Sequence, residues 1–232
     1  MTRTYSALVN PTITALLDTL VDKLTDPELY QATMTKLGSH FGDVLLNQIN
    51  SPSASVYLAS TVEDADYLSK GILDRLETQI NSIAFACFWN QRLSPFDIED
   101  LQIAPILRKY QEPSSKTVNY LVVVKSIISG ACVVKTNLLE LIQKIDPEKI
   151  FIVAPVIHTQ SEAKLKQEFT PNIYNKFQFV YFAQDDERAP DGEMIPGIGG
   201  MVYDRLGFKD QDDKNHYIPK IVKSRRAKLA LV

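Results

Sequence analysis

The sequence predicts an α/β fold built on a parallel sheet. Three observations support this prediction: short runs that are apolar at every position, helix-like stretches between those runs, and a helical pair that precedes them. Runs that are apolar on both faces suit strands covered by helices on both sides, as in a parallel sheet. The alternation of strand and helix then indicates crossover connections, which are right-handed in such sheets.

The N-terminal region, residues 10–50, has the pattern of a helical hairpin. Leucine and valine recur at steps of three and four between Leu16 and Leu24, which is typical of one buried helix face. The second helix is expected to begin at Thr25-Asp-Pro-Glu28, which offers a capping residue, a first-turn proline and an acid near the positive end of the helix dipole. A polar break at residues 51–55 precedes a third predicted helix over residues 61–80.

The spacing of the apolar residues changes after this predicted helix. Short β-branched and aromatic runs alternate with two helix-like stretches, and in such sheets ligands bind where the loops leave the carboxyl ends of the strands. The predicted strands are residues 82–90, 118–128, 149–157 and 177–183, and the helices between the last three are residues 133–145 and 159–170.

Composition bounds the class of protein. The 232 residues fit one large domain, or one domain with a small appendage. A hydrophobic content of 45% is that of a globular protein and not of a disordered one. The net charge of −3 argues against non-specific nucleic-acid binding by the body of the protein. No apolar run is long enough to cross a bilayer and the start is unlike a signal peptide, so we expect no membrane insertion and a cytoplasmic location.

Cysteine and histidine offer little chemistry. Cys87 and Cys132 lie in apolar runs and are too few for a disulfide scaffold, which favours buried thiols in a reducing compartment. The three histidines have no metal-like spacing. His158 follows a predicted strand, where it either lines a pocket or has a capping or surface role.

The C-terminal segment differs in charge from the rest. We expect a main domain over residues 1–212 and a basic extension over residues 213–232. From Lys214 onward the chain carries six cations and no acid. The extension is either a solubilising tail or an arm that docks on an acidic protein partner or on a phosphate-bearing surface. Its apolar residues indicate that part of it packs.

Residues 192–208 contain five of the chain's nine glycines. Glycine is tolerated where the backbone needs a positive φ or where another backbone or a ligand comes very close. The segment is therefore a tight turn or a binding loop.

The glycines belong to a longer ordered pattern. Asp186-Glu187 is followed by Gly192-Glu-Met-Ile-Pro-Gly-Ile-Gly-Gly200 and then by Asp204-Arg-Leu-Gly207. This pattern resembles the C-terminal segment of uracil phosphoribosyltransferases, and weaker similarity in the same order covers residues 8–210. The resemblance implies a phosphoribosyltransferase type I-like fold. It also implies a role in pyrimidine salvage, in which the phosphoribosyl group of PRPP is transferred to uracil to give UMP and pyrophosphate, by a protein expected to be a homodimer.

The resemblance also implies a site for each half of the reaction. Mg²⁺ would be needed only if catalysis survives, and Asp186 and Glu187 would lie beside the pocket. The residues expected to bind PRPP or phosphate are Arg92, Arg108, Lys125, Ser126, Ser129, Gly130 and Ala131. Those expected to bind the base are Ile195, Pro196, Gly197, Ile198, Gly199 and Gly200.

Departures from the family pattern affect the PRPP half. Lys125 stands where the family has an aspartate and Ser126 where it has a proline, while the Leu-Arg-Ala-Gly turn is replaced by residues 89–93. The loop after residue 124 is therefore an anion site or a plain turn, and the glycine segment is a base site or a folding element. We expect a non-catalytic relative that binds a nucleotide, a phosphate or a protein partner. The alternative is an active uracil phosphoribosyltransferase.

Overall fold

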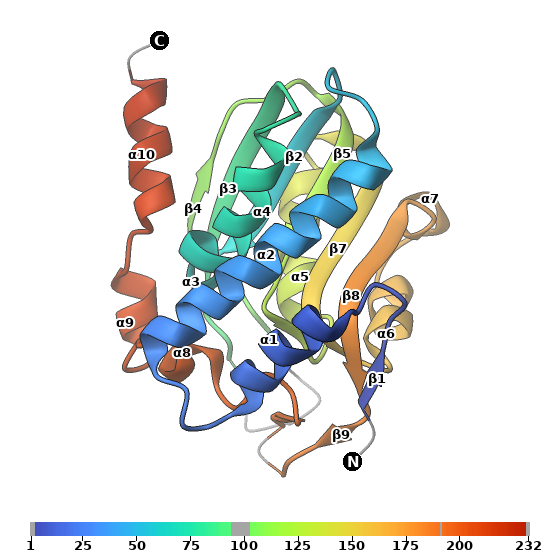
Figure 1. Cartoon of the computed structure of the whole chain (residues 1–232). Helices are drawn as coiled ribbons and strands as arrows, with labels where there is room; N and C mark the ends of the chain where they lie inside the picture. The colour runs from blue at the N-terminus through green and yellow to red at the C-terminus, as the bar shows by residue number, and fades with distance from the viewer. Residues whose placement is uncertain (1–2, 94–102, 191, 231–232) are drawn as a thin grey trace.

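A mainly parallel β-sheet forms the centre of the protein (Figure 1). The computed structural model describes residues 3–93, 103–190 and 192–230. The strand order is β1-β8-β7-β5-β2-β3-β4, and β6 extends the pairing along β7. The parallel strands are β2 (Ser55–Thr61), β3 (Ser82–Asn90), β5 (Thr117–Val124), β6 (Ile127–Ile128), β7 (Asp146–His158) and β8 (Phe177–Asp185). The antiparallel edge strands are β1 (Arg3–Tyr5) and β4 (Ile106–Gln111).

The four predicted strands are confirmed, and one central strand, β2, was not predicted. β2 lies between β5 and β3 in the middle of the sheet, yet it occupies the gap between the predicted break at residues 51–55 and the predicted helix at residues 61–80. Its seven residues, Ser-Val-Tyr-Leu-Ala-Ser-Thr, are too short for strong periodicity, although six of them are buried. Length and β-branched content were the signals available for it.

The position of β2 creates a switch point. The chain leaves β2 for β3 on one side, and later enters β5 on the other side. The loops after β2 and β5 therefore start from neighbouring strands and diverge in opposite directions, which opens a crevice at the carboxyl edge of the sheet.

Helices cover both faces of the sheet (Figure 1). The N-terminal hairpin is confirmed: Asn10 and Asp26 each accept a hydrogen bond from a first-turn N–H group, at 3.0 Å from Ile13 and 2.9 Å from Leu29. The near face carries α1 (Pro11–Val21), α2 (Pro27–Ile49), the short helix α3 (Val62–Asp64), the π-helical turn η1 (Ala65–Ser69) and α4 (Lys70–Leu76). The far face carries α5 (Cys132–Ile142), α6 (Ser161–Gln167) and α7 (Pro171–Tyr174).

Two separate apolar cores result from this layering. Between the hairpin and the sheet, the rings of Phe41 and Phe182 stack with centroids 3.9 Å apart. On the other face, Leu138 of α5 packs with Leu121 and Ile152 of the strands. The sheet is thus apolar on both faces, as the uninterrupted apolar runs predict.

The C-terminal segment, from residue 187 onward, folds over the carboxyl edge of the sheet and along one side of it (Figure 1). A small hairpin, β9 (Glu187–Arg188) and β10 (Met194–Ile195), leads through the glycine segment to α8 (Val202–Arg205), α9 (Gln211–His216) and α10 (Lys220–Leu229). The expected boundary at residue 212 falls inside α9. Lys214 is only 1% exposed, and Ile221 and Val222 of α10 join the main core. The first part of the basic segment is therefore packed against the body of the protein.

Across the described part of the chain, no helix combines the length and the apolar character that crossing a bilayer requires.

Candidate functional site

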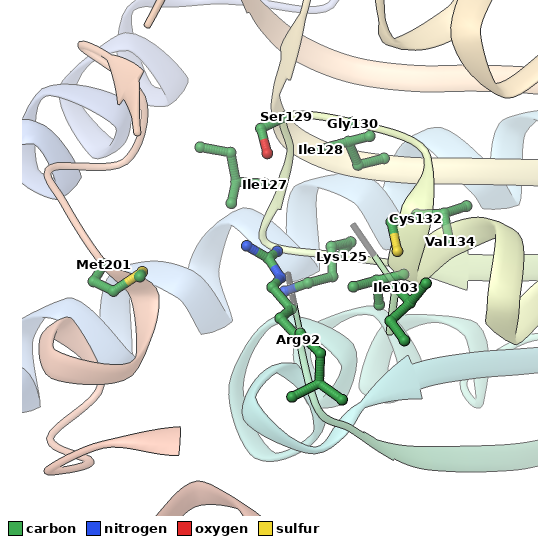
Figure 2. A pocket seen from close by; sticks show the side chains of 12 residues that line it. Arg92, Ile103, Lys125, Ile127, Ile128, Ser129, Gly130, Cys132, Val134 and Met201 are labelled. Carbon is green, nitrogen blue, oxygen red and sulfur yellow. The ribbon is translucent and has the colours of Figure 1, made fainter. Parts of the chain in front are cut away.

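Two adjoining cavities lie beside the switch point, at the carboxyl edge of the sheet. The larger has a volume of about 260 Å³ and the smaller of about 120 Å³. They share four lining residues, Arg92, Ile127, Ser129 and Met201. Figure 2 shows the Arg92 side chain rising between Met201 and the loop that carries Ile127 and Ser129. The Arg92 side chain thus borders both cavities.

The larger cavity is walled by the loop after β5 and by the first turn of α5. Gly130, Cys132 and Val134 line it from this side. The N-cap residue of α5, Ala131, makes no side-chain cap, and the first turn holds no acid. A helix start without a cap presents N–H groups and the positive end of its dipole, which favours an anion.

The smaller cavity is walled by the β9–β10 hairpin and the glycine segment. Its lining includes Arg188, Glu193, Gly200 and Tyr203. The Arg188 guanidinium donates a hydrogen bond to the main-chain carbonyl of Ser129. The hairpin is thereby joined to the loop after β5, so the two predicted half-sites lie next to each other.

A buried ion cluster lies behind the larger cavity. The Lys125 ammonium is 2.9 Å from Oδ2 of Asp64 and 3.1 Å from Oε1 of Glu63. These two carboxylates follow β2, whereas Lys125 follows β5, so the ion pairs join the two strands at the switch point. All three side chains are at most 4% exposed.

Ser126 is turned into this cluster and away from the cavities. Its N–H group donates to Oδ2 of Asp64 at 3.1 Å, and its hydroxyl accepts from the Lys125 ammonium at 3.1 Å. Oδ2 of Asp64 also accepts from the Thr61 hydroxyl at 2.7 Å. Ser126 is fully buried and lines neither cavity.

Burial and neighbouring charges shift the pKa values of Glu63, Lys125 and Lys214. Burial alone would raise the pKa of Glu63, but the charges of Lys125 and Lys214 outweigh it and hold that pKa at about 2. Burial opposes the charge of Lys125, and Asp64 and Glu63 more than compensate, so its pKa is raised. Burial lowers the pKa of Lys214, whose ammonium donates to the carbonyl of Asn90 at 2.7 Å.

The glycine segment is built against the N-terminal hairpin. Gly197 and Gly199 have φ of +56° and +81°. A Cβ on Gly199 would lie 2.1 Å from the carbonyl oxygen of Leu20 in α1. Ile198 is buried, and its carbonyl accepts a hydrogen bond from the Tyr30 hydroxyl at 3.0 Å. Of residues 195–200, Gly200 alone lines a cavity, so close packing explains the inner glycines.

Asp185 holds the same segment from the sheet side. Its Oδ2 accepts from the N–H group of Gly197 at 2.9 Å and from the Arg3 guanidinium at 2.7 Å. Arg3 also donates to the Gly197 carbonyl at 2.5 Å. The neighbouring acids that the resemblance favours lie elsewhere: Asp186 is exposed, Glu187 is in β9, and neither lines a cavity.

The remaining predicted residues are dispersed. Arg108 lies exposed on β4, with its guanidinium carbon 5.7 Å from the centroid of the Trp89 ring, and lines neither cavity. Ala131 is the N-cap of α5 and also lines neither. His158 is mostly buried and its Nδ1 accepts from the N–H group of Gln160 at 3.1 Å, a local capping role. Burial, Arg188 and Lys164 lower the pKa of His158.

The structure brings four of the predicted residues, Arg92, Lys125, Ser129 and Gly130, together around the larger cavity. It adds residues that sequence reasoning missed, because they are far apart along the chain. The one signal for Glu63 and Asp64 was two adjacent acids at the start of a helix that follows an apolar run. The added residues are Glu63, Asp64, Arg188 and Lys214.

The residues at this edge do not fit Mg²⁺. Glu63 and Asp64 are bound to the Lys125 ammonium, and a lysine cannot ligate a cation. Within residues 3–93, 103–190 and 192–230, no three histidine, cysteine, aspartate or glutamate residues are grouped as metal ligands.

Comparisons with known proteins find similarity in structure. No protein-family model and no curated protein matches the chain. The AQ2163 protein from Aquifex aeolicus is 16% identical, with a TM-score of 0.69 over 87% of this chain and 97% of that one. Adenine phosphoribosyltransferase from Trypanosoma brucei is 11% identical, with a TM-score of 0.48 over 99% and 100% of the two chains. Hypoxanthine phosphoribosyltransferase from Staphylococcus aureus is 10% identical, with a TM-score of 0.41 over 67% and 74%.

At these identities the similarities concern the fold alone. The fold class that the sequence predicts is confirmed: a mainly parallel α/β sheet preceded by a helical hairpin. Phosphoribosyltransferases are among the solved structures similar to it.

Proposed function

We propose that this protein is a non-catalytic, phosphoribosyltransferase-like protein that binds an organic phosphate of the nucleotide kind in the two adjoining cavities. The observation that carries the proposal is the salt-bridged Lys125, which lies at the switch point between the carboxylates of Glu63 and Asp64. The resemblance of the glycine segment to uracil phosphoribosyltransferases supports a pyrimidine nucleotide as the ligand.

The phosphate group would lie at the beginning of α5. There the main-chain N–H groups of the first turn, the hydroxyl of Ser129 and the guanidinium of Arg92 surround the larger cavity. A guanidinium matches two phosphate oxygens at once, and a helix start adds N–H donors. This arrangement suits one phosphate group.

Transfer from PRPP is disfavoured by charge. PRPP carries three phosphoryl groups in all, and its diphosphate is ordinarily handled together with a divalent cation. Within the part of the chain that the structure describes, the ion cluster and Arg92 comprise three cations, Arg92, Lys125 and Lys214, against the two carboxylates, which leaves one positive charge uncompensated there. Because the carboxylates are bound to Lys125 and do not fit Mg²⁺, the site lacks the charge that the diphosphate requires.

Calorimetry on the purified protein tests the binding proposal. UMP should bind, and Arg92→Gln should weaken binding at least tenfold because the guanidinium shared by both cavities is lost. Arg108→Gln is the matched control, since that arginine lies outside both cavities, and it should leave binding unchanged. An absence of binding by UMP and by inorganic phosphate would contradict the proposal.

The alternative, an active uracil phosphoribosyltransferase, is tested in the same preparation. With PRPP, Mg²⁺ and labelled uracil, the proposal expects no UMP to form. UMP formation that disappears in Arg92→Gln would establish the alternative. A homodimer and a protein partner bound through residues 213–232 stay predictions, for which light scattering measures the oligomeric state.

A further inference from the structure

The larger cavity is apolar for a phosphate site. Apart from Arg92, Lys125, Ser129, Gly130 and Cys132, its lining consists of aliphatic side chains and a methionine. Lys125 is neutralised by the carboxylates behind it. The cavity therefore offers an anion one region of positive charge, and offers the rest of a ligand a hydrocarbon surface.

The apolar surface continues onto the rim. Leu93, Ile103 and Met201 line the cavity and are 42%, 42% and 46% exposed. Leu93 and Ile103 pair as an isolated antiparallel bridge, and Met201 comes from the segment just before α8. Large apolar side chains that gather around one opening mark a binding surface more often than the same residues scattered singly.

The hydroxyl groups of a sugar would find few hydrogen-bond acceptors in the larger cavity. Among the described residues that line the larger cavity there is no aspartate, glutamate, asparagine or glutamine. Sugar hydroxyl groups placed against this wall would lose water without gaining acceptors, which costs binding free energy.

We infer that the ligand is an amphipathic phosphate monoester, with one phosphate group at Arg92 and the start of α5 and an apolar or aromatic body against Leu93, Ile103 and Met201. The inference rests on the proposed function and narrows its ligand class. Two features of the described site favour this ligand. The one cation that the carboxylates do not compensate suits a single phosphate group, and the hydrocarbon surface suits an apolar body.

Titration calorimetry with small probes tests this inference. Phenyl phosphate should bind at least tenfold more tightly than ribose 5-phosphate, because the ring buries apolar surface and the sugar does not. Equal affinity for these two compounds would overturn the inference and leave the proposed function standing. Phenol that binds as tightly as phenyl phosphate would instead overturn the proposed function, since the phosphate group would then contribute nothing.

Variants of the rim supply the second readout. The double variant Leu93→Gln with Met201→Gln replaces exposed side chains, so folding should be retained. It should bring the affinity for phenyl phosphate down to that for ribose 5-phosphate while leaving inorganic phosphate unaffected. Leu107→Gln is the matched control: Leu107 is 55% exposed on β4 and lines neither cavity. A rim variant that keeps the preference for phenyl phosphate would contradict the inference.

Discussion

Lys125 lies in the loop after β5 with its ammonium buried against two carboxylates. Isolated buried charges are strongly unfavourable, and burial of an ion pair is tolerated when each partner is also hydrogen-bonded. Here Asp64 accepts hydrogen bonds from Thr61 and from the N–H group of Ser126 as well. The buried charge of Lys125 is therefore compensated by the two carboxylates, which hold the loop after β5 against the residues that follow β2.

The pH dependence of stability should report this cluster. The pKa of Glu63 is about 2 in the folded protein against 4.5 as its ordinary value. A lowered carboxyl pKa stabilises the fold above the ordinary value, and that stabilisation is lost as the pH falls from about 4.5 to 2. At about 1.4 kcal/mol for each pKa unit, the loss is on the order of 3 kcal/mol.

Urea unfolding of the native chain and of Glu63→Gln, followed from pH 6 to pH 2, measures this effect. The native chain should be the more stable at pH 6, and the difference between the two should shrink as the pH falls. A difference that stays constant over this range would contradict the ion cluster.

At the scale of elements, the glycine segment illustrates how one loop is held by two distant parts of the chain. All five of its glycines have positive φ, and no other described glycine does. The Tyr30 hydroxyl from α2 and the Asp185 carboxylate at the end of β8 both bind its main chain. The segment thus joins the helical hairpin to the carboxyl edge of the sheet, where it forms part of the smaller cavity.

Substitution of two of these glycines separates backbone strain from close packing. Gly192 and Gly199 have nearly the same φ, +85° and +81°. A Cβ on Gly192 meets nothing within 4 Å, whereas one on Gly199 meets the Leu20 carbonyl oxygen at 2.1 Å. Gly192→Ala should therefore cost about 1–2 kcal/mol in the free energy of unfolding, and Gly199→Ala clearly more. Chemical denaturation measures both, and equal losses would contradict the packing explanation.

At the scale of the whole molecule, the C-terminal segment completes the core beside the site. Lys214 reaches the Asn90 carbonyl at the end of β3, and its ammonium is 4.7 Å from the centroid of the Tyr203 ring. Arg225 of α10 pairs with Glu112 at 2.8 Å and also with Glu77. The charged side chains of this segment therefore stabilise the fold itself, whether or not a partner binds.

Two truncations test this role. A chain that ends at Gln211 loses Lys214 and the apolar face of α10, so it should be strongly destabilised. A chain that ends at Arg226 loses only residues whose side chains, where described, are exposed, and its thermal midpoint should stay close to that of the full chain. If the Gln211 truncation were as stable as the full chain, the segment would be a separate extension after all.

Local sequence patterns determined much of the secondary structure of this protein. The helix starts at Asn10 and Asp26, four strands of the sheet and the positive φ of the glycines follow from neighbouring residues, because capping, strand periodicity and backbone sterics act over a few positions. The loop that carries Lys125 and Ser129 was predicted to line a site because strand ends converge in a parallel sheet.

Only the tertiary structure decided what this edge of the sheet can hold. Lys125 meets Glu63 and Asp64 across 62 and 61 residues, Arg188 reaches Ser129 across 59, and Gly199 meets α1. No local pattern encodes these contacts, because they depend on which strands become neighbours, and β2, the strand that places the two acids, has too little periodicity to be predicted. The sequence by itself predicted a loop at the end of a strand with Lys125 at its start. The fold decided that this lysine is buried, paired with two carboxylates and bordered by a cavity.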